Sequence, residues 1–182
     1  MLLALRQGWV GRAELAAMLW PEQPTKLAYT NLRKTLFRLQ SVGWAANIEG
    51  QGGALRLDAP TDVAAFEAAL REQRGADALA LRRGELLVGF DDDGNQAWSN
   101  WLRFERDRLR VAWRRAAVDR LAQEIDPGDG IELSAQLLDV DPLDEPALCL
   151  HMAWLARDGQ SARARQAYRV FEIGRASCRE RV

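Results

Sequence analysis

The sequence has 182 residues, 48% apolar and 28% charged, with a formal net charge of −1, which is typical of a globular chain with one large core or two small ones. No apolar run reaches the roughly 20 residues that a membrane-spanning helix needs, and the opening residues are too few for a signal peptide, so we expect a cytoplasmic protein without a membrane segment. Two cysteines and one histidine exclude a disulfide framework and a cysteine-rich metal site, and we expect neither a cofactor nor a bound metal.

Two short helices are predicted at the start of the chain. Residues 1–7 are largely apolar and lack an N-terminal cap, which indicates the last turns of a helix whose beginning lies outside the sequence. A second helix is predicted over residues 12–20, with Gly11 at its cap position. Pro21 and Pro24 then bracket a turn.

Residues 25–41 show the spacing of one amphipathic helix. One side is apolar or small, at Leu27, Ala28, Leu32, Thr35, Leu36 and Leu39, and the other side gathers cations. Thr25 is predicted to cap the first turn, and Gly43 lies where left-handed geometry would end the helix. Residues 1–57 hold seven cations and three carboxylates, a net charge of +4 that leaves −5 for the rest. Any polyanion partner is therefore expected at this part of the chain, with an ordinary solvated surface as the alternative.

Residues 47–58 predict a β-hairpin with a mobile tip, because Ile48 on one arm and Leu55 and Leu57 on the other flank a glycine-rich stretch. Helix, turn, basic helix and hairpin follow one another in the order of a winged helix-turn-helix.

The blocks G-W-V-G-R-A-E-L-A-A-M-L-W-P-E, T-N-L-R-K-T-L-F-R-L and G-G-A-L-R-L resemble the DNA-binding domain of the SARP-type bacterial transcriptional activators, which is similar to response-regulator winged helices. That family usually has Ser or Thr where Gly11 stands and Tyr where Ala54 stands, so weaker capping and wing anchoring are expected here. The family domain also begins with a small sheet and most of a first helix. We therefore expect residues 1–58 to form a partial winged helix-turn-helix.

Pro60 marks a linker, and residues 62–171 are predicted to be all α. The predicted elements are a helix capped by Asp62, a short helix at 76–83, an apolar loop at 86–90 that tucks into the core, a long helix at 96–124 ended by Pro127, Gly128 and Gly130, and alternating helices and turns from 131 to 171. The last part is typical of a tetratricopeptide-like array, in which Ala153, Ala164 and Ala167 let helices approach closely. It resembles the bacterial transcriptional activator domain that follows the winged helix in SARP-type activators.

Several polar residues of this part have simple expected roles. Cys149 is predicted to be a buried thiol, and His151 a satisfied, partly buried histidine rather than a catalytic base. A calcium loop at 91–95 is excluded, because with Gly94 as the loop glycine the terminal ligands would be Gly89 and Asn100. Its acids are expected to complement the dipole of the long helix instead. No nucleophile has a base partner, so no catalytic residue is predicted.

The last residues, 172–182, do not continue the apolar spacing. The string E-I-G-R-A-S-C-R-E-R-V matches the translation, in this frame, of a widely used sequencing adapter. We predict a non-native tail in which Cys178 has no biological role, with a genuine basic tail as the alternative that the codons would decide. The sequence is then expected to be truncated at both ends.

A DNA reader needs cations for phosphates and a few side chains that reach base edges. The residues expected to contact DNA are Arg12, Lys26, Thr30, Arg33, Lys34, Phe37, Arg38 and Gln51. The alternative is that they form the solvated face of a packed helix. The resemblance implies that the turn formed by Pro21, Glu22, Gln23 and Pro24 faces RNA polymerase.

The expected fold is mainly α, with a partial winged helix-turn-helix and its β-hairpin wing followed by an all-α tetratricopeptide-like domain. The resemblance implies a sequence-specific transcriptional activator that binds direct repeats in promoter double-stranded DNA and recruits RNA polymerase, without catalysing a reaction. It also implies a helical domain that forms a homodimer or relays a signal. The alternative is a helical-repeat protein-interaction scaffold with a non-functional winged helix.

Overall fold

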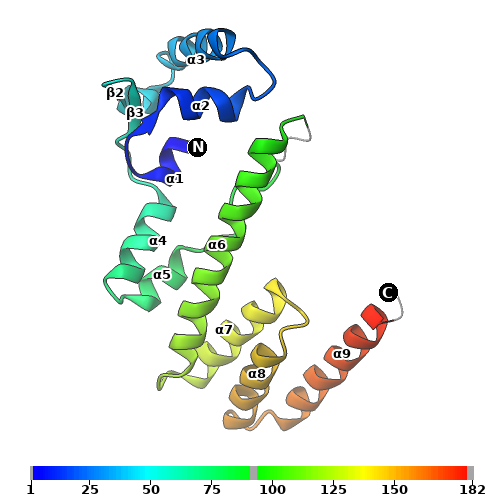
Figure 1. Cartoon of the computed structure of the whole chain (residues 1–182). Coiled ribbons are helices and arrows are strands. Elements are labelled where there is room, and N and C mark those ends of the chain that lie inside the picture. Colours follow the sequence, from blue (N-terminus) through cyan, green and yellow to red (C-terminus); the bar gives the residue numbers. More distant parts are fainter. Residues whose placement is uncertain (1, 91–93, 180–182) are drawn as a thin grey trace. The chain divides into compact units, whose positions relative to one another are not determined.

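The computed structural model describes residues 2–90 and 94–179, without the side chains of residues 44, 46 and 177–179. The described chain is mainly helical with a small antiparallel sheet near its beginning, which confirms the mainly α fold class (Figure 1). It divides into two compact units, a first unit Met1–Val111 and a second unit Ala112–Val182. The division falls within a helix, and the predicted domain boundary at residues 58–62 stays a prediction.

The first unit contains α1 (Leu2–Arg6), β1 (Val10–Gly11), α2 (Arg12–Leu19), α3 (Thr25–Leu39), the 3₁₀ helix η1 (Gly43–Asn47), β2 (Ile48–Gln51), β3 (Ala54–Leu57), α4 (Asp62–Arg71), α5 (Gly75–Leu81) and most of α6 (Gln96–Leu121). The strands are ordered β1-β3-β2, with Val10 opposite Leu55 and Ile48 opposite Leu57. The hairpin turns at Gly52 and Gly53, whose φ angles of 55° and 82° favour glycine. The predicted hairpin is confirmed.

Helix ends differ from the predictions in three places. The cap residue of α3 is Pro24, and Thr25 is already helical without a side-chain cap bond. Gly43 has no left-handed geometry, because α3 has already ended and Gly43 begins η1. Thr61, whose backbone is still extended, caps α4 in place of Asp62, and its Oγ1 accepts a hydrogen bond from the third helical amide at 3.0 Å.

One hydrophobic core holds the first unit together. Its buried members are Leu2, Val10, Leu15, Ala16, Ala28, Leu32, Leu55, Trp98 and Leu102. Trp98 and Leu102 belong to α6, so the first turns of the long helix complete the core beneath the hairpin. Asn95, buried just before α6, fixes this docking. Its Nδ2 donates to the Met18 carbonyl at 2.9 Å, and its Oδ1 accepts from the Trp98 amide at 3.0 Å.

The loop at 86–90 follows the prediction only in part. Leu86 and Leu87 pack against the core, and Arg106 donates to both of their carbonyls at 2.8 Å. Val88 and Phe90 are 71% and 54% exposed, because the left-handed residues at 87 and 89 turn the chain outward. The acids at 91–93 that were expected to complement the dipole of α6 lie outside the described residues.

The second unit contains the end of α6, α7 (Pro127–Val140), α8 (Glu145–Arg157) and α9 (Ser161–Arg179). α7 and α9 both pack on α8, and successive helices run back and forth as hairpins (Figure 1). Gly159 turns the chain between α8 and α9 with a φ of 72°. The tetratricopeptide-like arrangement is confirmed.

The glycines after α6 do not act as helix breakers. α7 begins at Pro127, where Asp126 caps it by accepting from the Gly128 amide at 2.8 Å. Gly130 lies inside α7 and is buried, and a Cβ there would come within 2.3 Å of the Trp154 ring. Its lack of a side chain therefore allows α7 and α8 to approach closely.

Burial on α8 and α9 corrects two further predictions. Cys149 is exposed, because the buried positions of α8 include 147, 148, 151, 154 and 155, which leaves position 149 on the opposite side. Ala153 is also exposed, whereas Ala164 is buried and Ala167 half-buried. His151 is buried and lies 2.9 Å from the Ser134 hydroxyl through its Nδ1, which confirms a satisfied histidine.

Asp144 links the start of α8 to α6 within the second unit. Its Oδ1 accepts from the Ala147 amide at 3.0 Å and so caps α8. Both carboxylate oxygens also accept from Arg114, at 2.6 and 3.0 Å. The hydrogen bonds from Arg114 hold the pKa of Asp144 below its ordinary value, against the effect of burial.

Replacing Asp144 by Ala is expected to lower the free energy of unfolding by about 1.5 kcal/mol at pH 7. About 1 kcal/mol comes from the lost cap, and the ion pair contributes the smaller part because the Arg114 side chain is 43% exposed. Asp144→Asn retains an oxygen for the cap and should lose less. Urea unfolding at pH 7 measures both effects.

The difference in stability between the wild type and these variants should depend on pH in a defined direction. Because the pKa of Asp144 is lower in the folded state, its ionic contribution is present above the unfolded pKa of about 3.9 and is lost as the pH falls through the folded value. The gap between the wild type and Asp144→Asn should therefore shrink from pH 7 to pH 3.5. A gap of constant size would contradict this assignment.

Candidate nucleic-acid interface

The predicted contact residues of α3 lie on one exposed face. The helix buries Ala28 and Leu32 on its opposite side. Positions 26, 30, 33, 34, 37 and 38 recur at intervals of three and four and therefore share a face, and the cations among them, Lys26, Arg33, Lys34 and Arg38, are exposed. Leu27 was predicted to lie on the buried apolar side, but it is 44% exposed.

The cations on this face have no acidic partners within the part of the chain that the structure describes. Other arginines of the first unit are paired: Arg6 with Glu14 at 2.9 Å and Arg56 with Glu49 at 2.8 Å. Because no carboxylate among the described residues of the unit pairs with it, the face of α3 has a positive charge available for a polyanion.

Two uncharged residues lie among these cations. The Thr30 hydroxyl donates to the Lys26 carbonyl at 2.9 Å and retains acceptor capacity. The Phe37 ring is 73% exposed. An exposed ring beside cations offers apolar contact to a base methyl group.

Arg12, one of the residues expected to contact DNA, is the first residue of α2 and lies close to the hairpin. Its backbone amide donates to the Gly53 carbonyl at 3.0 Å, and its guanidinium lies against the hairpin, where a Cβ on Gly50 would be 3.3 Å from Nη2. The Nε of Arg12 is buried without a hydrogen-bond partner in the described structure. Arg12 therefore supports the wing. Gln51, also expected to contact DNA, is exposed near the hairpin tip.

Sequence reasoning missed Arg56 on β3. Its guanidinium carbon lies 5.1 Å from the centre of the Trp9 ring, and it also pairs with Glu49 across the hairpin. Alternation along β3 was the available signal, since Leu55 points into the core and its neighbour must point outward. Arg56 thus adds a cation to the surface of the hairpin.

The turn between α2 and α3 is accessible. Pro21, Glu22, Gln23 and Pro24 are all exposed, and the Gln23 amide donates to the Trp20 carbonyl at 3.2 Å. Trp20 itself packs against the core. A partner can therefore reach the turn while Trp20 anchors it.

The chain from β3 onward matches a known family. The model of the bacterial transcriptional activator domain matches residues 54–174, from β3 into α9, which is well over half of the chain. No curated protein matches the chain. None of the described helices combines the length and apolar character needed to span a membrane. The chain belongs to the family of the bacterial transcriptional activator domain.

Proposed function

We propose that the protein is a sequence-specific DNA-binding activator of transcription, with a winged helix-turn-helix in residues 1–58 and α3 as its recognition helix. The unpaired cationic face of α3, set beside a glycine-turned hairpin, supports this proposal most directly. Membership of the activator family supports it independently. The mechanism is binding and recruitment, and no reaction is catalysed.

In this proposal the parts of the interface have separate roles. The α3 cations contact phosphates and release counterions, which supplies affinity. Thr30 and Phe37 approach base edges in the major groove, and Gln51 reaches a neighbouring groove. The exposed turn between α2 and α3 faces RNA polymerase, as the family resemblance implies. The same resemblance implies direct repeats in promoter double-stranded DNA as the target, and a helical domain that forms a homodimer or relays a signal.

A salt titration of binding to promoter-length duplex DNA tests the proposal. The wild type should show a steep fall of log K with log salt concentration. Replacing Arg33 and Lys34 together by Ala should make this slope shallower by about 1.8, because each lost phosphate contact removes about 0.9.

The matched control removes two exposed arginines from α9, Arg165 and Arg169, and changes the net charge equally. Its slope should equal that of the wild type. A flat wild-type profile, or an unchanged slope in the α3 variant, would contradict DNA binding through α3 and favour the interaction-scaffold alternative.

A further inference from the structure

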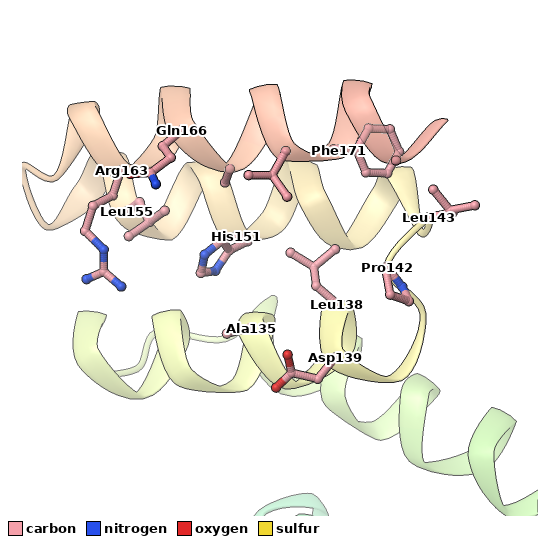
Figure 2. A pocket seen from close by; sticks show the side chains of 13 residues that line it. Ala135, Leu138, Asp139, Pro142, Leu143, His151, Leu155, Arg163, Gln166 and Phe171 are labelled. Carbon is pink, nitrogen blue, oxygen red and sulfur yellow. The ribbon is translucent and has the colours of Figure 1, made fainter. Parts of the chain in front are cut away.

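A cavity of about 660 Å³, open to solvent, lies between α7, α8 and α9 in the second unit (Figure 2). This volume falls within the usual range for small-molecule sites. Because α7 and α9 pack on α8 more than on each other, the space between them is lined by side chains from all three helices. Leu138, Leu155 and Phe171 supply apolar walls from α7, α8 and α9 respectively.

The two ends of the cavity differ in polarity. Figure 2 shows Arg163, Gln166 and His151, with Leu155 beside them, toward one end, and Leu138, Pro142, Leu143 and Phe171 toward the other. Arg163 donates to the neutral side chain of Gln160 and makes no ion pair with any residue that the structure describes. The polar end therefore has a solvent-exposed guanidinium that no described carboxylate pairs with.

The other titratable groups of the cavity increase the difference in charge between its two ends. Burial, and then the charge of Arg163, lower the pKa of His151, so its ring is neutral at pH 7 and the positive charge belongs to Arg163. Among the described lining residues Asp139 is the single carboxylate, and it lies on α7 toward the end opposite Arg163 (Figure 2). A second negative charge on a ligand would meet Asp139 there.

We propose that this cavity binds a small amphipathic monocarboxylate, with its carboxylate at Arg163 and Gln166 and its apolar body between Leu138, Leu155 and Phe171. The planar guanidinium suits a carboxylate in a two-bond arrangement. A neutral ligand would gain no ion pair with Arg163, a cationic ligand would be repelled by it, and a dicarboxylate would place a negative charge near Asp139. The proposal does not depend on DNA binding by the first unit.

Calorimetric titration of the whole chain with sodium octanoate tests this site. One molecule should bind saturably to the wild type. Arg163→Gln should weaken binding at least tenfold, because a charge-assisted hydrogen bond is lost. 1-Octanol, which has the same chain without the charge, and octanedioate, which has a second carboxylate, should each bind the wild type at least tenfold more weakly than octanoate does.

Two further variants separate the site from its surroundings. Arg165→Gln removes an exposed charge from the same helix outside the cavity and should leave octanoate binding unchanged. Val170→Asn makes the wall polar at a residue that is 63% exposed, so the chain should still fold, as circular dichroism would show, while binding weakens. Unsaturable binding, equal affinity for Arg163→Gln and the wild type, or equal affinity for octanol and octanoate would overturn the proposal.

Discussion

Replacing Trp98 by Ala is expected to destabilise the first unit by about 3–5 kcal/mol, the usual cost of removing a buried aromatic side chain. Trp98 is 8% exposed, its ring centre lies 5.0 Å from that of Trp101, and its Nε1 donates to the Phe90 carbonyl at 3.1 Å. The same core includes residues of α2, α3 and β3. A change in α6 should therefore loosen the hairpin and the basic helix, which are distant from it in sequence.

Hydrogen exchange read by mass spectrometry measures this coupling locally, without assuming that a chain with two compact units unfolds in a single step. Amides of α2 and β3 should exchange faster in Trp98→Ala. Phe104→Ala on the same helix is the control, since that ring is 66% exposed and its loss should change stability by less than about 0.5 kcal/mol. Unchanged protection of α2 and β3 in Trp98→Ala would show that α6 does not complete their core.

Local sequence patterns predicted the elements that are determined by residues close together in the sequence. The α3 helix follows from apolar spacing, and the hairpin follows from Gly52 and Gly53 at positions that need positive φ. β1 was not predicted, because a strand of two residues is too short to show alternation. Asn95 was missed for a different reason: it bonds to a carbonyl 77 positions away, and no local signal announces such a contact.

The candidate interface also contains residues that local patterns predict and residues that they do not. The cationic face of α3 follows from residue spacing along one helix, so its residues were predicted together. The position of the Arg12 side chain depends on where the hairpin folds back, because its guanidinium lies beside Gly50. The cavity of the second unit was not predicted either, since its guanidinium and its apolar walls come from three helices whose packing decides the space between them.

Gly130 is the residue at which the sequence signal and the structural role differ most. Pro127, Gly128 and Gly130 together indicate a break between helices. Yet α7 begins at Pro127 and continues through Gly130, and the Trp154 ring of α8 occupies the place of the missing side chain. Close helix packing therefore explains this glycine, which makes a substitution there informative.

Gly130→Ala is expected to lower the free energy of unfolding by about 2 kcal/mol, measured by urea unfolding followed with circular dichroism. In an open helix this change would stabilise by about 1 kcal/mol. Here the new Cβ would lie 2.3, 2.5 and 2.8 Å from three atoms of the Trp154 ring, which is 3% exposed and cannot move into solvent without leaving the core. Forcing α7 and α8 apart costs about 3 kcal/mol, which exceeds the gain in helix propensity.

Gly174→Ala provides the matched control for this sign reversal. Gly174 also lies inside a helix of the second unit, but a Cβ there would lie 3.7 Å from the nearest side-chain atom, on Leu143, which is an ordinary contact. This variant should therefore gain up to about 1 kcal/mol from helix propensity alone. If both glycine variants were stabilised alike, α7 and α8 would not be packed as closely as Gly130 requires. Opposite signs in the two variants would establish that contact with Trp154, rather than helix breaking, requires glycine at position 130.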